Sequence, residues 1–338
     1  MISCIASLRD PALAATVLSR TPLLYAEGAD ASLDRPKHVR AGSSLTWFGN
    51  RLAVIQDDAL FIALIDLENG RVDVLPLPAG EGGLRQFDDL RGNKPFKLDL
   101  EACLTIPSPD GDVLLAFGSG STKRRDSVVR VSACGAIEVI QASELYDRLR
   151  TTKSFSGSEL NVEGAVFTDG WVRFFNRGNG QAREGLLPVD ASCDVLWAEL
   201  EAYLRNPDML DAPELHGIVQ YDLGALAGVR LTFTDATVTD LGLLYVASAE
   251  SSPDAITDGS VTGSVIGILD ERGGRWTELR DADGRPCGAK VEGICAARTL
   301  DGRIYVVIDA DDPVLPSELL EVALSGPWTQ ARPSVSTI

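Results

Sequence analysis

The chain has 338 residues, 45% of them hydrophobic, so it can bury a large core, and its formal net charge is −18. A surface this acidic repels phosphate backbones and anionic lipid, which argues against nucleic acid and membrane surfaces as partners. The sequence contains no run of about 18 apolar residues that would predict a membrane-spanning helix. Its six cysteines are scattered without a CxxC pair, which argues for reduced thiols in a cytoplasmic protein.

Five segments share one layout: a short strand, a tight turn, a second apolar strand and a polar cluster. Asp-Gly pairs at 110–111 and 169–170 supply the positive φ that a tight hairpin requires. The segments begin at Ala41, Leu98, Leu160, Thr232 and Ala289. A third strand is predicted at 61–67, 128–132, 264–270 and 318–324.

This repetition predicts an all-β fold, a β-propeller of five blades that forms a single domain over residues 1–338. A sixth blade made from the two termini stays open as an alternative. Residues 15–26 are expected to supply a strand that closes the ring with the last blade. One amphipathic helix is predicted as an insertion near 194–210, and the basic run 123–125 is predicted to be a solvated loop.

An acidic position recurs in the first strand of four of the segments. It holds Glu101, Glu163, Asp235 and Glu292, with Ser43 or Ser44 in the remaining segment. Because innermost strands line the channel of a propeller, we expect these carboxylates to meet near its mouth. Their mutual repulsion requires protons, Lys97 and Lys290, or a cation, and Ca²⁺ suits an all-oxygen ligand set. Alternatively, the acids bind backbone amides of neighbouring blades and only hold the sheets in register.

Two further sets of polar residues extend this site. Asp99 and Asn161 precede their glutamates by two residues and offer additional oxygen ligands. Asp57, Asn176, Arg177, Glu250 and Asp309 follow the second strands and are predicted to line a substrate pocket. Arg177 is expected to bind an anionic group of the substrate. Turn chemistry is the alternative explanation for these polar clusters.

Short phrases in the sequence resemble known propellers. KVEGI (290–294), NVEGA (161–165) and DLEA (99–102) resemble phytase-like and esterase-like bacterial propellers, and calcium-dependent lactonase and arylesterase propellers. QDDALFIALID and KLDLEACLTIPSPDGDVLLAFGSGST more closely resemble an uncharacterised family of bacterial propeller proteins, over most of residues 38–325. These resemblances imply the propeller fold. The lactonase-type propellers further imply a catalytic Ca²⁺ held by Glu, Asn and Asp side chains.

The combined expectation is a metal-dependent hydrolase that acts on a small-molecule ester, lactone or phosphoester at the channel mouth. Only two histidines occur and GxSxG is absent, so the base is expected to be a carboxylate. Glu101, Glu163 and Glu292 are the predicted catalytic residues, and the same three with Asn161 and Asp235 are the predicted calcium ligands. A non-catalytic propeller that binds a small ligand or a protein partner is the main alternative, and glycoside cleavage by paired carboxylates is a third. The sequence indicates no oligomeric state.

Overall fold

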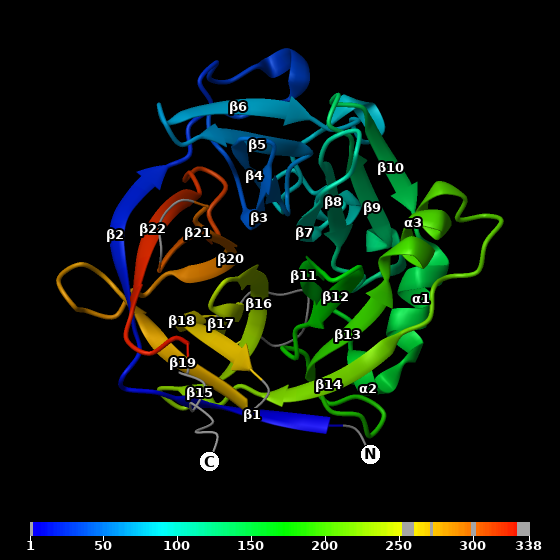
Figure 1. The fold of residues 1–338 in the computed structure, drawn as a ribbon. Coiled ribbons are helices and arrows are strands. Elements are labelled where there is room, and N and C mark those ends of the chain that lie inside the picture. The colour runs from blue at the N-terminus through cyan, green and yellow to red at the C-terminus, as the bar shows by residue number, and fades with distance from the viewer. Residues whose placement is uncertain (1–2, 252–259, 271–272, 299–301, 330–338) are drawn as a thin grey trace.

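Antiparallel strands arranged around one axis make up most of the fold (Figure 1). The computed structural model describes residues 3–251, 260–270, 273–298 and 302–329. Within these residues the strand pairings form five antiparallel groups of four. This radial arrangement of four-stranded sheets is that of a β-propeller.

The first three groups follow the chain order. The first contains β3 (Gly42–Phe48), β4 (Arg51–Gln56), β5 (Phe61–Asp66) and β6 (Arg71–Pro76). The second contains β7 (Leu100–Ile106), β8 (Val113–Gly118), β9 (Ser127–Val131) and β10 (Ile137–Gln141). The third contains β11 (Val162–Thr168), β12 (Trp171–Asn176), β13 (Asp190–Leu196) and β14 (His216–Asp222).

The last two groups adjoin the N-terminal strands. The fourth contains β16 (Val229–Thr239), β17 (Gly242–Ser251), β18 (Ser260–Asp270) and β19 (Gly273–Arg280), with the short β15 (Ala225–Leu226) beside β16. The fifth contains β20 (Lys290–Ala296), β21 (Arg303–Asp309), β22 (Glu318–Ser325) and β2 (Ala14–Pro22). The outer strand of the last group therefore comes from the N-terminal part of the sequence.

The N-terminal segment also joins neighbouring groups to one another. β1 (Ser3–Arg9) pairs in parallel with β14 through its first half and with β19 through its second half. β2 pairs antiparallel with β22 and in parallel with β19. Strands β1 and β2 thus run along the outer edges of the third, fourth and fifth groups and cover edges that would otherwise be unpaired.

The innermost strands β3, β7, β11, β16 and β20 surround the axis (Figure 1). Each contacts the next around the ring, and β20 contacts β3. Apolar cores fill the spaces between adjacent groups. Phe117 of β8, for example, meets Phe174 of β12 edge to face, with ring centroids 5.0 Å apart. This packing between sheets fixes the positions of the inner strands.

Three helices lie in the described residues, where the sequence predicted one. The predicted helix near 194–210 is shorter, because α3 covers Trp197–Arg205 and residues 194–196 belong to β13. Two helices were missed, α1 (Ser143–Thr151) and α2 (Lys153–Ser156). The apolar spacing of Leu145, Tyr146 and Leu149, all buried, was the available signal for α1. None of the described helices is long and apolar enough to cross a membrane.

Candidate functional site

A β-bulge recurs near the start of every inner strand. In each pairing with the second strand, the register skips one residue. The skipped residues are Ser43, Glu101, Glu163, Thr234 and Glu292. A bulge bends its strand and re-aims the extra side chain, and bulges are common beside functional sites. The five residues therefore occupy one equivalent position around the axis.

Two of the bulge residues are hydroxyls that link neighbouring inner strands. Ser43 Oγ donates to the carbonyl of Leu100 (2.5 Å), and Thr234 Oγ1 donates to the carbonyl of Val291 (2.7 Å). In both cases the acceptor residue directly precedes the bulge of another inner strand. An ionised glutamate has no proton to donate, so it cannot make this bond. The three glutamates are thus the positions at which the hydroxyl link is lacking.

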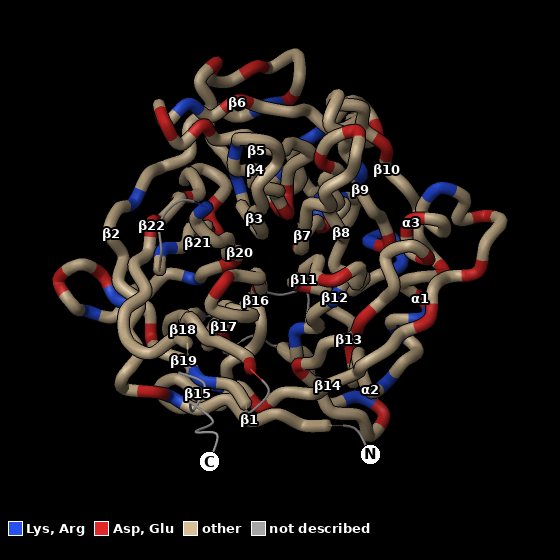
Figure 2. The backbone as a smooth tube through the Cα atoms, in the orientation of Figure 1, with Lys and Arg blue, Asp and Glu red and all other residues tan. Residues whose placement is uncertain are grey.

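The glutamates line a small cavity at one end of the channel, which we call the charged pocket. Its volume is about 60 Å³, room for about two water-sized groups. Seven carboxylates and four cations line it among the described residues. The carboxylates are Asp57, Asp99, Glu101, Glu163, Glu292, Asp309 and Asp311, and the cations are Lys97, Arg125, Arg177 and Lys290. Acidic and basic positions accordingly lie side by side around the ring in Figure 2.

Each of these cations is held by carboxylates. Lys97 pairs with Asp57 and with Asp99 (2.6 Å), and Arg125 pairs with Asp99 (2.7 Å). On the other side, Arg177 pairs with Glu163 (3.2 Å) and Glu250 (2.5 Å), and Lys290 pairs with Glu250 (3.4 Å) and Glu292 (2.8 Å). The network is rigid because nearly all of its members are buried. It still leaves more negative than positive charge on the pocket wall.

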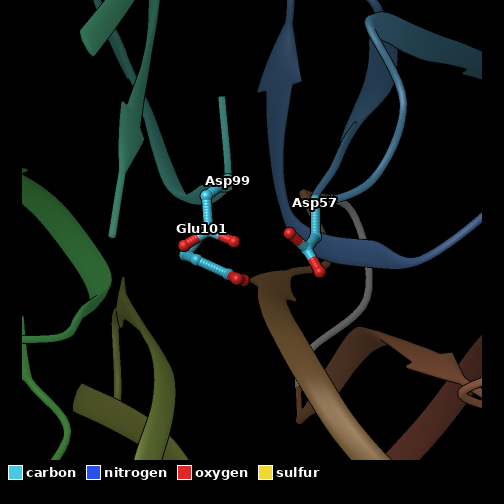
Figure 3. Close-up of side chains that lie close together, drawn as sticks. All are labelled: Asp57, Asp99 and Glu101. Atoms are coloured by element: carbon cyan, nitrogen blue, oxygen red, sulfur yellow. The ribbon is translucent and has the colours of Figure 1, made fainter. Parts of the chain in front are cut away.

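Glu101 is the bulge glutamate that lacks a charged partner among the described residues. In the described part of the chain its carboxylate has no hydrogen bond and no ion pair within 4.0 Å. Figure 3 shows it next to Asp57 and Asp99, with ligand oxygens of all three within 4.8 Å of one another. Burial raises the pKa of Glu101 well above its usual value, and the charges of Asp57 and Glu163 raise it further. Glu101 is therefore poised to take a proton or a cation.

Other carboxyls of the charged pocket are perturbed in the same direction. Burial raises the pKa of Glu163 to about 7, although Arg177 opposes the shift. Burial, reinforced by Glu292, raises the pKa of Asp309 to about 6. The exception is Asp99. Burial would raise its pKa too, but Lys97 and Arg125 hold it below the usual range. The pocket thus combines one firmly ionised carboxylate with several that exchange protons near neutral pH.

The predicted position of Asp235 requires a correction. Asp235 lies one residue beyond the bulge, does not line the charged pocket, and is 1% exposed. Its Oδ2 accepts hydrogen bonds from Ser44 Oγ (3.0 Å) and the Ile294 amide (3.0 Å), and its Oδ1 accepts one from the Ala236 amide (2.8 Å). It joins β16 to β3 and β20, which is the structural role that the sequence offered as the alternative for all four acids.

The space for Asp235 comes from small residues at the equivalent position of the other strands. These are Ser44, Ala102, Gly164 and Gly293. A Cβ on Gly164 would lie 3.3 Å from Asp235 Oδ1, and a Cβ on Gly293 would lie 2.8 Å from the Cα of Ser44. A larger side chain would therefore crowd the axis at this level. We describe Asp235 and these neighbours as the floor of the charged pocket.

Three predicted pocket residues also have other partners. Asn176 is fully buried outside the pocket, where it accepts from the Asn161 amide (2.8 Å) and donates to the Val189 carbonyl (2.8 Å). Glu250 lies behind the wall and binds Arg177 and Lys290. Arg177 does line the pocket, but its guanidinium is bound by Glu163 and Glu250. The expectation that it binds an anionic substrate is therefore not supported by its contacts.

Asn161, Asp57 and Asp309 line the charged pocket as predicted from the sequence. Asn161 donates its side-chain amide to Glu163 Oε1 (2.7 Å), which leaves its amide oxygen as the atom it can offer. Arg125 was missed. The basic run 123–125 was predicted to be solvated, yet Arg125 is buried and pairs with Asp99. Its position just before a buried strand was the only available signal.

Comparison with known proteins places the chain in a family. A model of the family of unknown function DUF6929 matches residues 38–324. The chain belongs to this family. No curated protein matches this DUF6929 member in sequence.

Solved structures similar to this DUF6929 member share little sequence with it. One is the PQQ-bound aldose sugar dehydrogenase of Streptomyces coelicolor (11% identity, 93% of this chain and 99% of that chain covered, TM-score 0.46). A GH43 β-1,3-galactosidase has 11% identity over 89% of this chain and 59% of that chain, with a TM-score of 0.48. A protein with a provisional gluconolactonase assignment has 11% identity, 96% and 97% coverage, and a TM-score of 0.39.

In this DUF6929 member the charged pocket adjoins two larger cavities. One, of about 210 Å³, includes Arg40, Asp58, Phe87 and Leu90 in its wall. The other, of about 480 Å³, lies between the fourth and fifth groups of strands, and both have a more apolar wall than the charged pocket. Asp309 and Asp311 line all three cavities. The charged pocket is therefore connected to a wider cavity on each of two sides.

Proposed function

We propose that this protein is a calcium-dependent hydrolase of a small ester, lactone or phosphoester, and that the reaction takes place in the charged pocket of a five-bladed propeller. The observation that carries the proposal is the surplus of carboxylates, with Glu101 outside every ion pair that the described residues form. Such an arrangement is unfavourable unless protons or a cation compensate it. Each of the five strand groups is interpreted as one blade.

The donor atoms fit a hard divalent cation. Carboxylate and amide oxygens are what Ca²⁺ prefers, and the pocket offers no sulfur or imidazole ligand among its described lining residues. Glu101, Glu163, Glu292 and Asn161 would hold the ion, with Asp57 beside them. Asp99 is less suited, because Lys97 and Arg125 already neutralise it. The resemblance of NVEGA and KVEGI to lactonase propellers supports the same ion.

The residues of the pocket can move and hold protons as hydrolysis requires. A bound calcium ion would supply positive charge that polarises the carbonyl or phosphoryl oxygen of the substrate. With no ion bound, Glu163 exchanges a proton near neutral pH, because its pKa is raised to about 7, and Asp309, which is outside the proposed ligand set, has its pKa raised to about 6. Arg177 and Lys290 hold Glu163 and Glu292 in place through their ion pairs. Asp235 holds the floor beneath them.

Calorimetric titration of the metal-depleted protein with calcium chloride tests the proposal. Calcium is expected to bind, to raise the melting temperature, and to be required for turnover of 4-nitrophenyl esters. Glu101→Gln should lose all three effects, because it removes the one bulge glutamate that has no ion pair among the described residues. Glu68→Gln, a change at an exposed glutamate, is the matched control and should retain them. If the unaltered protein neither binds calcium nor hydrolyses the esters, the proposal is wrong.

One observation favours a non-catalytic binding protein as the second candidate. Every lysine and arginine that lines the charged pocket is held in an ion pair, so the pocket is pre-organised to bind a small polar ligand without chemistry. This candidate predicts no stoichiometric metal in the purified protein. Elemental analysis of protein dialysed without chelator therefore distinguishes the two.

A further inference from the structure

An apolar groove lies directly beside the charged pocket. Its volume of about 480 Å³ falls in the range of about 300–1,000 Å³ that is typical of small-molecule sites. The apolar part of its wall is formed by Val261, Ala289, Ile308, Ala310, Leu315 and Pro316. These residues come from β18, the segment before β20, the end of β21 and the segment between β21 and β22. We call this cavity the apolar groove.

The apolar groove and the charged pocket share part of their walls. Lys290, Asp309 and Asp311 line both. A ligand can therefore extend from one into the other without leaving the protein surface. The charged pocket alone, at about 60 Å³, accommodates only a small polar group such as an ester or a lactone carbonyl. The rest of a substrate must lie outside it.

Apolar side chains in and beside the groove are exposed to solvent in this acidic protein. Leu315 is 47% exposed and the neighbouring Val314 is 69% exposed, although the chain carries a net charge of −18. Apolar side chains grouped around a concave surface favour an apolar ligand, because its burial removes hydrocarbon surface from water. The seven carboxylates of the charged pocket meanwhile repel a substrate that carries a phosphate.

We infer that the substrate is an ester or lactone with an apolar acyl chain, which lies in the apolar groove while its carbonyl group lies in the charged pocket. This inference rests on the proposed hydrolase function and selects among its substrate classes. In the reaction, the oxygen of water bonds to the acyl carbon and the bond from that carbon to the alcohol oxygen breaks. One water proton passes to the alcohol, and the other is released as the new acid ionises.

Chain-length dependence tests the inference. With calcium present, kcat/KM is measured for 4-nitrophenyl acetate, butyrate and octanoate. The octanoate ester is expected to exceed the acetate ester at least tenfold, because its additional methylene groups are buried in the groove. Leu315→Glu places a charge in the groove and should reduce this ratio to about one. Leu315 is half-exposed, so the substitution should not impair folding.

Leu187→Glu provides the matched control, because Leu187 is 68% exposed and lines none of the three cavities. It should leave the ratio unchanged. Hydrolysis of all three esters at similar kcat/KM would overturn the inference and leave the proposed function standing. If no ester is hydrolysed, the proposed function fails, and binding of the neutral fluorophore N-phenyl-1-naphthylamine tests the groove separately. Binding weakened only by Leu315→Glu supports an apolar site, whereas equal binding by all variants contradicts it.

Discussion

The bulge residues divide the inner strands into two kinds. In β3 and β16 the bulge carries a hydroxyl that donates to a neighbouring inner strand. In β7, β11 and β20 it carries a glutamate that faces the charged pocket. The backbone irregularity is the same in all five strands, so the difference lies in the side chain alone. One kind of bulge contributes a contact between strands, and the other contributes charge to a cavity.

A purely structural ring would be expected to use the hydroxyl at every bulge. Three glutamates at this position place like charges in a buried space and raise the pKa values of the group. Groups that cost stability in this way are typical of functional sites. The floor below the pocket differs in its hydrogen bonds, although burial raises the pKa of its carboxyl as well. There Asp235, equally buried, satisfies three donors from three strands and has a structural explanation.

The largest expected effect is at Asp235. Asp235→Ala leaves Ser44 Oγ and the amides of Ile294 and Ala236 without their acceptor in a buried position. We expect the free energy of unfolding to fall by about 3–5 kcal/mol, measured by urea denaturation. Asp208→Ala, at an exposed loop position, is the control and should change stability little. A loss below about 1 kcal/mol would show that the floor does not depend on this carboxylate.

A pH dependence of stability follows from the raised pKa values. In the unfolded chain, Asp and Glu titrate near about 4, whereas in the fold Asp309 and Glu163 titrate at about 6 and about 7. The folded state holds these protons more tightly, so the stability they contribute is complete below about pH 4. It is lost as the pH rises through the two folded values. The lowered pKa of Asp99 acts below about pH 4 and does not cancel this loss.

Urea denaturation in EDTA should therefore show a free energy of unfolding that falls by about 3 kcal/mol between about pH 5 and pH 8. Calcium at pH 8 should restore most of the loss, because a cation replaces the missing protons. Glu163→Gln removes one of the titrating groups and should flatten the profile. Stability that rises with pH in EDTA would contradict the assignment of the charge surplus to the glutamate bulges.

A smaller effect in the opposite direction is expected at Glu101. Glu101→Gln removes a carboxyl whose ionised form has no ion-pair partner in the described residues, and should stabilise the calcium-free protein by about 1 kcal/mol at a pH at which Glu101 is ionised. In the presence of calcium the same substitution should lower stability, because a ligand is lost. Thermal denaturation with calcium or with EDTA measures both. The same sign in both conditions would mean that Glu101 does not take part in ion binding.

The repeated strand pattern in the sequence was enough to predict the sheets and the approach of three glutamates. It was not enough to set the register of the fourth inner strand. The sequence alignment placed Asp235 opposite the glutamates because both are acidic. In the structure, V-E-G-A at 162–165 corresponds to F-T-D-A at 233–236, so Thr234 occupies the bulge. A bulge inserts one residue without changing the hydrophobic pattern, so the pattern alone cannot locate it.

The sequence also could not predict which charged residues form ion pairs with one another. Lys97 and Lys290 could be proposed as neutralising groups because they lie close to the glutamates along the chain. Arg125 reaches Asp99 from the segment between β8 and β9, far along the chain but within the same group of strands, and Glu250 of β17 reaches Arg177 only through the packing of separate groups. The pairing of Arg177 with Glu163 within the third group, and with Glu250 of the fourth, changes the role expected for Arg177. Long-range ion pairs leave no periodic trace in a sequence.

The smallest effects are expected at the hydroxyl bulges. Thr234→Val keeps the shape of the side chain but removes the donor to the Val291 carbonyl, and Ser43→Ala removes the donor to the Leu100 carbonyl. Each should lower the free energy of unfolding by about 1 kcal/mol, the usual contribution of one buried hydrogen bond. Thr234→Ser keeps the hydroxyl and removes only the methyl group, so it should retain the hydrogen bond to Val291. If Thr234→Val is as stable as the unaltered protein, the hydroxyl does not stabilise the link between β16 and β20. The contrast between the two kinds of bulge would then rest on charge alone.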